Sequence, residues 1–138
     1  MRIELAQTNE EIIECHAVMR HLRDVDASTF LERVRSQEKA GYRLAFLRLN
    51  GSPVAVAGFR VSENLAWGRH LYVDDLVTLA EARSRGHGAA LLSWLDRLAK
   101  QEGCEQIHLD SGTEREDAHR FYVRKGFNVS SLHFKKIL

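Results

Sequence analysis

The sequence predicts an α/β (α+β) fold in which about four helices flank a mixed, mostly antiparallel sheet of six to seven strands. A hairpin signal, Asn50-Gly51, lies near the start of a three-strand antiparallel meander from Tyr42 to Leu79. From Leu76 to Trp94, an apolar strand, a glycine turn and a helical pattern follow one another, and a further strand comes next. That order implies a parallel pair joined by a right-handed crossover, so the sheet should be mixed.

The chain has the size and composition of one domain, 1-138, with 44% hydrophobic and 28% charged residues. A net charge of +1 without basic runs argues against a nucleic-acid or membrane-surface partner. No apolar run approaches the roughly 18 residues of a membrane span, and the acidic start is unlike a signal sequence. The cysteines, Cys15 and Cys104, lack a CxxC spacing. They are expected to be small buried hydrophobes, which fits a reducing cytoplasm.

The first third of the chain predicts an edge strand and two helices. Arg2 to Ala6 alternates polar and apolar residues as an edge strand does. Thr8 or Asn9 is placed to cap the first helix, and Gly41 is a stop signal for the second, which starts near Ser28. The residues expected to face inward are Ile12, Cys15 or His16, Met19, Leu22, Phe30, Leu31 and Val34.

The rest of the chain predicts the remaining strands and helices. Turn residues and changes of hydrophobic period mark their ends. Ser62 to Asn64 is expected to connect two strands of the meander. The predicted elements are strands over 42–49, 53–61 and 65–79, a helix from Gly86 to about Gly103, a strand over 106–111, a helix over 114–125, and closing strands over 127–132 and 133–138.

The turn before the long helix has the composition of an anion site. Gly86 and Gly88 flank His87, which is expected to point to solvent or to a phosphate. A helix that starts here leaves its first N–H groups unpaired, and Arg83 and Arg85 add positive charge. The alternative is an ordinary glycine-eased turn with solvated arginines.

Arg83-Ser84-Arg85-Gly86-His87-Gly88-Ala89 resembles the Arg/Gln-x-x-Gly-x-Gly/Ala signature of the GNAT superfamily of acyl-CoA N-acyltransferases. The resemblance covers almost the whole chain and implies the GNAT fold. It also implies that these seven residues hold the pyrophosphate of the co-substrate acetyl-CoA, while the backbone of Leu76, Val77 and Thr78 meets the pantetheine. Ser84 stands where the family usually has glycine.

A second segment, Ala118-His119-Arg120-Phe121-Tyr122-Val123-Arg124-Lys125-Gly126-Phe127, resembles the family's Ala-x-x-Phe-Tyr-x-x-x-Gly-Phe motif. By this resemblance Tyr122 is the general acid that protonates the departing thiolate. The alternative is an aromatic side chain packed in the core beside Phe121. Arg115 replaces an asparagine that often contacts the pantetheine, and it could instead reach a phosphate.

Asp74 and Asp75 lie inside an apolar strand, where aspartate is disfavoured. Polyamine acetyltransferases of the family show a similar acidic pair. By that match Asp74 is the candidate base, or anchors a water, and Asp75 binds the acceptor. Successive strand residues face opposite ways, so both can serve the site only if the strand carries the bulge seen in this family. The alternative is a surface pair offset by Arg69 or another cation.

The leading hypothesis is an acetyl-CoA-dependent N-acetyltransferase in which a primary amine attacks the thioester directly. The acceptor class stays open among a polyamine, an aminoglycoside, an amino acid, and a protein lysine or N-terminal amine. A catalytically idle acyl-CoA sensor is the alternative, and a nucleotide-binding module ranks last because the Walker lysine is missing. The histidines lack metal-ligand spacing, so no metal is expected. A homodimer is a family-level expectation.

Overall fold

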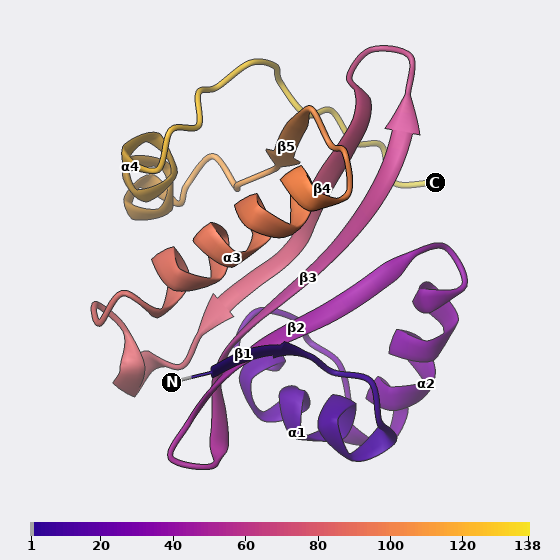
Figure 1. The fold of residues 1–138 in the computed structure, drawn as a ribbon, viewed down its shortest axis with the longest axis vertical. Coiled ribbons are helices and arrows are strands. Elements are labelled where there is room, and N and C mark those ends of the chain that lie inside the picture. Colours follow the sequence, from indigo (N-terminus) through magenta and orange to yellow (C-terminus); the bar gives the residue numbers. More distant parts are fainter. Residues whose placement is uncertain (1) are drawn as a thin grey trace. The chain divides into compact units, whose positions relative to one another are not determined.

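The computed structural model describes residues 2–138 and forms a mixed α/β fold (Figure 1). The chain divides into two compact units, one that ends at His108 and one from Leu109 to Leu138, and each is described by itself. The elements in chain order are β1 (Arg2–Leu5), α1 (Asn9–Met19), α2 (Ala27–Glu38), β2 (Tyr42–Leu49), β3 (Ser52–Asn64), β4 (Gly68–Thr78), a short 3₁₀ turn (Ala80–Ala82), α3 (His87–Gln101), β5 (Gln106–Leu109) and α4 (Glu116–Arg124).

The sheet has the strand order β1-β2-β3-β4-β5. The first four strands form three antiparallel pairs, as the meander predicted. Asn50 (φ 52°) and Gly51 (φ 83°) make the β2–β3 turn with the positive angles that a two-residue hairpin requires. The expected connection at Ser62 to Asn64 is wrong, because β3 runs on to Asn64 by pairing with the start of β4.

Five strands are present in residues 2–138, not the six to seven expected. The predicted closing strands over 127–132 and 133–138 are absent, although their hydrophobic alternation is typical of strands. A strand is stable only beside a neighbour that takes up its N–H and C=O groups, and alternation alone does not supply one. The apolar side chains of this segment are instead exposed: Val129, Leu132, Phe134, Ile137 and Leu138.

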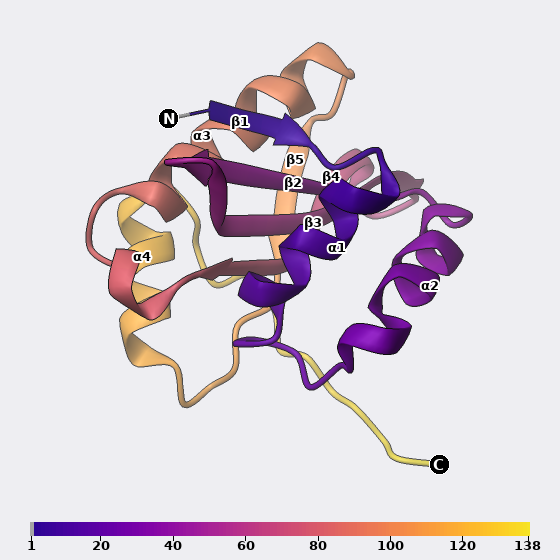
Figure 2. The ribbon, with the colours of Figure 1, turned by 90° about the horizontal axis from the view of Figure 1, so that it is seen from below.

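Helices α1 and α2 cover one face of the sheet and α3 covers the other (Figures 1 and 2). On the α1–α2 face, Ile12 and Phe30 pack with sheet residues such as Phe46 in one buried cluster, as the helical spacing predicted. Cys15 is fully buried in this cluster, and burial raises the pKa of its thiol to about 12. The thiol therefore stays protonated at neutral pH and packs as a small hydrophobe.

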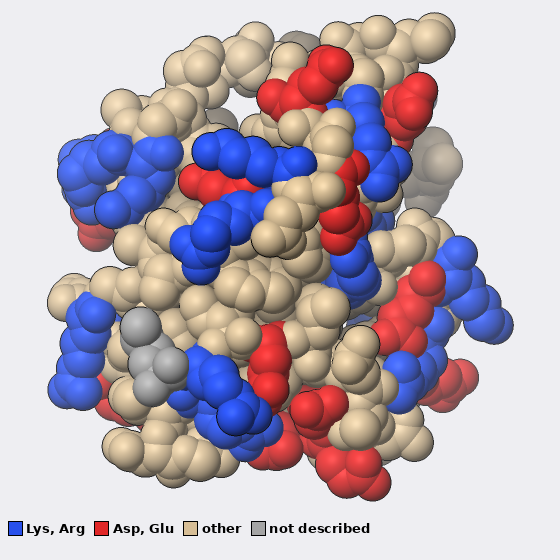
Figure 3. All heavy atoms as spheres, in the orientation of Figure 1, with Lys and Arg blue, Asp and Glu red and all other residues tan. Residues whose placement is uncertain are grey.

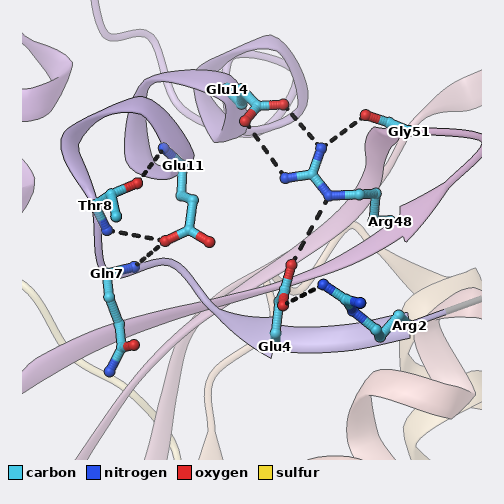
Figure 4. Close-up of polar contacts among 8 residues, drawn as sticks. All are labelled: Arg2, Glu4, Gln7, Thr8, Glu11, Glu14, Arg48 and Gly51. Atoms are coloured by element: carbon cyan, nitrogen blue, oxygen red, sulfur yellow. Dashed lines mark hydrogen bonds and ion pairs between the residues drawn. The ribbon is translucent and has the colours of Figure 1, made fainter.

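The start of α1 is fixed by a capping box (Figure 4). The Glu11 N–H donates to Thr8 Oγ1 at 3.1 Å, and Glu11 Oε1 accepts from the Thr8 N–H at 2.9 Å. Beside it, the Arg48 guanidinium of β2 donates to the Glu14 carboxylate of α1 at 2.9 Å. These contacts hold α1 against the sheet and so set where the following connection begins.

Aromatic and ionic contacts are among those that join α3 to the sheet. Trp94 meets Phe59 edge to face, with 6.3 Å between ring centroids. Arg43 of β2 donates two hydrogen bonds of 2.8 Å to the Glu102 carboxylate beyond α3, which lowers the pKa of Glu102. Helix α3 is thereby anchored at its C-terminal end and along its buried side.

Positive and negative side chains are interspersed over the face drawn in Figure 3. This mixture agrees with the net charge of +1. Within residues 2–138, no helix has the length and apolar character needed to cross a membrane.

Candidate active site

The central feature of the candidate site is a β-bulge in β4. Gly58 of β3 pairs with Asp75, and the next residue, Phe59, pairs with Val73, so Asp74 is the extra residue. The bulge that the sequence analysis required is therefore present. Because it interrupts the alternation of side chains, both carboxylates reach the face that α1 and α2 cover.

Asp74 is held by Arg60 of β3. The Arg60 Nε and Nη2 atoms donate to the two Asp74 oxygens, each at 2.8 Å. This bidentate contact raises the pKa of Arg60, and Arg60 also lies 5.3 Å from the centre of the Tyr72 ring. The Asp74 side chain keeps 25% of its surface exposed, so solvent still reaches the carboxylate.

Asp75 is more deeply placed and is held from two sides. The Tyr42 hydroxyl of β2 donates to Asp75 Oδ2 at 2.8 Å, and Arg23 Nε donates to Oδ1 at 2.7 Å. Arg23 Nη2 also donates to the Asp74 carbonyl oxygen at 2.8 Å. Burial, and then the neighbouring Asp75 charge, raise the pKa of the Tyr42 phenol far above its ordinary value. Tyr42 therefore stays a proton donor to Asp75.

The Tyr42–Asp75 contact depends on the absence of a side chain at Gly58. A Cβ atom at this position would lie 1.8 Å from the Tyr42 hydroxyl oxygen and 2.7 Å from Asp75 Oδ2. Such distances are far below van der Waals contact, so the contact requires glycine here.

A cleft of about 250 Å³ opens beside this contact. Its wall comes from the end of α1, the α1–α2 connection and α2. The connection is fixed by a 2.7 Å hydrogen bond between His16 Nε2 and the Val25 carbonyl oxygen, and the His16 ring packs edge to face against Phe30. The lining residues are Met19, Arg23, Asp24, Val25, Phe30, Arg33, Val34, Gln37, Tyr42 and Asp75.

The end of β4 leads from the bulge to the glycine turn. Leu76, Val77 and Thr78 pair with Ala57, Val56 and Ala55 of β3, which uses one edge of the strand. The Thr78 carbonyl oxygen accepts a 3.3 Å hydrogen bond from Arg83 Nε. The guanidinium of Arg83 is therefore held close to the strand from which the turn departs.

The turn itself is exposed and is bent by two residues with positive φ. Arg83, Ser84, Arg85 and Gly86 are exposed, whereas Gly88 and Ala89 are half-buried in the first turn of α3. Gly86, at φ 82°, is the N-cap of α3, and Ser84 has φ 63°. Because glycine offers no side-chain cap, the first N–H groups of α3 are available to an external acceptor, where the helix dipole favours an anion.

Of the two positions expected for the His87 side chain, solvent or a phosphate, the structure rules out solvent. Its side chain is buried, with 6% exposure, so it does not point to solvent. Neither ring nitrogen has a hydrogen-bond partner in residues 2–138. Burying an imidazole without a hydrogen-bond partner costs free energy. A group that binds at the N-terminus of α3 and hydrogen-bonds to this ring would remove that cost.

Tyr122 and Arg115 belong to the second unit. Tyr122 lies on α4 with its ring centroid 5.4 Å from that of Phe121 and 5.7 Å from that of Phe127. Burial raises the pKa of the Tyr122 phenol, and the charge of Arg115 opposes this shift. Arg115 is the N-cap of α4 and has no side-chain capping bond. The phenol is therefore protonated at neutral pH, as a proton donor must be.

Sequence reasoning found the aspartates and the glycine turn but missed the groups that hold the aspartates: Arg23, Tyr42, Gly58 and Arg60. Their sequence distances from Asp74 and Asp75 carry no local signal. The glycine inside the apolar run PVAVAGFRV was the one available clue, because glycine in a strand often marks a close approach. Residues 2–138 contain no group of three or more potential metal ligands.

Comparison with known proteins places these features in a family. Residues 5–127 match the model of the acetyltransferase (GNAT) family. The chain is 37% identical over 132 residues to an uncharacterized N-acetyltransferase, YhdJ, of Bacillus subtilis, and this match covers 94% of the chain and 93% of the relative. It is also 37% identical over 98 residues to the aminoalkylphosphonate N-acetyltransferase of Salmonella typhimurium, with 70% of the chain and 62% of that protein covered.

A solved structure supports the same fold. The ribosomal-protein-alanine N-acetyltransferase of Brucella melitensis superimposes with a TM-score of 0.85 over 100% of both chains, at 16% sequence identity. At this identity the likeness concerns the fold alone.

Proposed function

The chain belongs to the acetyltransferase (GNAT) family and is an N-acetyltransferase, and we propose that it transfers acetyl from acetyl-CoA by direct attack of a primary amine. The observation that carries this mechanism is the order of features along β4: a bulge with two aspartates, a strand end, and then an exposed turn with Gly86 at the N-terminus of α3. We propose that residues 1-138 act together as one N-acetyltransferase domain.

The glycine turn is proposed to hold the pyrophosphate. The N–H groups of His87, Gly88 and Ala89 begin α3, and the exposed Arg83 and Arg85 lie just before them. Backbone N–H groups and guanidinium ions are the usual partners of phosphate at such a helix start. Ser84 contributes the second bend of the turn. In this proposal Arg115 reaches a phosphate.

The strand end is proposed to guide the rest of the coenzyme. One edge of Leu76, Val77 and Thr78 pairs with β3. The other edge is proposed to exchange hydrogen bonds with the pantetheine amides. A strand N–H near the thioester would stabilise the oxyanion of the tetrahedral intermediate.

The chemistry requires one proton acceptor and one proton donor. The amine nitrogen attacks the thioester carbonyl carbon, and collapse of the intermediate breaks the C–S bond to leave an amide and a thiolate. The acceptor ammonium first gives one proton to a β4 carboxylate so that its nitrogen has a lone pair: Asp74 accepts this proton, directly or through water, because it keeps solvent exposure, while Asp75 orients the acceptor from the cleft. The second proton that the nitrogen loses after its attack passes to water. Tyr122 donates its phenolic proton to the thiolate, so coenzyme A leaves as the free thiol.

The acceptor is proposed to be a small-molecule amine. The cleft beside Asp75 has a volume of about 250 Å³, slightly below the range of about 300–1,000 Å³ usual for ligand pockets. The relative that acts on aminoalkylphosphonates supports testing compounds of that kind alongside simple amines.

Isothermal titration tests the coenzyme site. Wild type should bind coenzyme A, and Gly86→Val should lose binding because a β-branched residue is strained at φ 82° and its side chain would occupy the space beside the helix start. Ser93→Val, an exposed change further along α3, is the control and should bind as wild type does. No binding by wild type at millimolar coenzyme A would refute the proposal.

Steady-state kinetics test the acid and the base. Tyr122→Phe should bind coenzyme A normally and show a lower kcat by about 10²-fold or more, the usual loss of a general acid. Asp74→Asn should lower kcat, whereas Asp75→Asn should mainly raise KM for the amine. Release of free thiol from acetyl-CoA only in the presence of an amine separates this enzyme from an idle acyl-CoA sensor.

A further inference from the structure

The cleft beside Asp75 carries balanced charge. Its lining includes two arginines, Arg23 and Arg33, and two aspartates, Asp24 and Asp75. The remaining wall is largely apolar, with Met19, Val25, Phe30 and Val34. A cleft built only for a cationic amine has no need of guanidinium groups, so the arginines require an explanation.

Arg23 already occupies the position that an acceptor ammonium would take. Its Nε donates to Asp75 Oδ1 at 2.7 Å, and the Tyr42 hydroxyl occupies the other oxygen. The Asp75 side chain is 13% exposed and the Arg23 side chain 53% exposed, so a molecule that enters meets Arg23 first. A purely cationic amine would have to bring a second positive charge beside Arg23, which is electrostatically unfavourable.

A zwitterionic amine avoids this conflict. Its ammonium takes the place of Arg23 at Asp75 Oδ1, and its anionic group accepts hydrogen bonds from the displaced guanidinium. The ammonium then faces Asp75 and the anionic group faces Arg23, so each of these four charges has an opposite partner and no buried charge is left uncompensated. Guanidinium groups bind carboxylate and phosphonate oxygens in a bidentate manner, and Arg33 on α2 offers a second one in the same cleft.

We propose that the acceptor is a small amine that also bears an anionic group, carboxylate or phosphonate, and that Arg23 and Arg33 bind that group while Asp75 binds the amine. This assignment rests on the proposed function. The limited volume of the cleft and its four charged side chains favour such a compound over a polyamine or a protein lysine.

The test measures thiol release from acetyl-CoA with amines of matched length: propylamine, 1,3-diaminopropane, 3-aminopropanoate and 2-aminoethylphosphonate. We expect kcat/KM for the two anionic amines to exceed that for propylamine by about tenfold or more, the effect of a charge-assisted contact. The two anionic compounds separate carboxylate from phosphonate preference. A kcat/KM for propylamine or the diamine equal to or above that of both anionic amines would overturn the proposal.

Variants locate the preference in the cleft. Arg23→Gln and Arg33→Gln should each narrow the ratio of kcat/KM between anionic amines and propylamine. Arg20→Gln, at an exposed arginine that is absent from the cleft lining, should leave the ratio unchanged. If the ratio of kcat/KM between anionic amines and propylamine in all three variants equals that of wild type, the proposed role of Arg23 and Arg33 is overturned. If wild type releases no thiol with any amine, the proposed function itself fails, whereas turnover of propylamine or 1,3-diaminopropane alone rejects only the zwitterionic acceptor.

Discussion

The proposed acceptor end of the site, at the bulge of β4, and the glycine turn that follows the end of this strand at Thr78 are built in opposite ways. At the acceptor end, side chains from the α1–α2 connection, β2 and β3 hold the carboxylates of Asp74 and Asp75 through four hydrogen bonds. At the turn, the backbone angles of Ser84 and Gly86 set the geometry, and the Arg83 side chain donates to the Thr78 carbonyl oxygen. The two carboxylates are therefore held in position before any ligand arrives, while the turn presents exposed donors to an incoming anion.

This difference indicates which properties a substitution in each region should change. A change at the acceptor end disturbs several long-range partners at once, so folding and acceptor binding should suffer together. A change in the turn alters local backbone strain and the proposed coenzyme contact, so its effect on the rest of the fold should be small. The three predictions below go from the largest expected effect to the smallest.

Gly58→Ala should have the largest effect. Its Cβ would lie 1.8 Å from the Tyr42 hydroxyl oxygen, so Tyr42 or the strands must move. Overpacking of this kind costs about 1–3 kcal/mol and should raise KM for the amine by separating Tyr42 from Asp75. Urea unfolding and amine kinetics measure the two effects.

Repeating the Gly58→Ala substitution in a protein that lacks the Tyr42 side chain tests the cause of this effect. In a Tyr42→Ala protein, the first obstacle to the new Cβ is gone, and Gly58→Ala should cost less there than in wild type. If Gly58→Ala lowers the free energy of unfolding equally in wild type and in the Tyr42→Ala protein, glycine at this position is not needed to accommodate the Tyr42 side chain.

Tyr42→Phe should change how stability depends on pH. The folded-state pKa of Tyr42 lies above its unfolded value of about 10, so above pH 10 the unfolded chain releases a proton that the folded chain keeps. The free energy of unfolding should therefore fall above pH 10, by up to about 1.4 kcal/mol per pH unit for this one proton, and Tyr42 should cause no fall below pH 10.

The comparison with Tyr42→Phe isolates this contribution. The buried Cys15 thiol, with a pKa raised to about 12, adds its own loss of stability as pH rises, in both proteins. Guanidinium unfolding at several pH values from 8 to 11 should give a shallower decline for the variant. Parallel curves would show that Tyr42 does not carry a raised pKa.

Ser84→Gly should have the smallest effect, and a favourable one. Ser84 adopts φ 63°, which costs a residue with a Cβ about 1–2 kcal/mol, whereas glycine adopts it freely. Glycine also gives up more entropy on folding, so the net gain should be below about 1 kcal/mol, with tighter binding of coenzyme A. Ser84→Ala keeps the Cβ atom and should bring no gain. An equal gain from both variants would contradict an origin in backbone strain.

Much of the fold and part of the site could be predicted because their signals are local. The Asn50-Gly51 turn, the capping residues of α1 and the inward faces of α1 and α2 follow from neighbouring residues and their period. The closing strands could not be predicted correctly, since the alternation from Phe127 to Leu138 carries no information about a pairing partner.

The sequence by itself determined the family motifs, the glycine turn and the presence of two aspartates in one strand, because each is a contiguous pattern. Only the tertiary structure decided that a bulge turns both aspartates to one face, that Arg60 holds Asp74, and that Arg23 and Tyr42 hold Asp75. The physical reason is that these partners lie 14 to 52 residues away in the chain. Strand register and helix packing bring them together, and neither is encoded in any single stretch of residues.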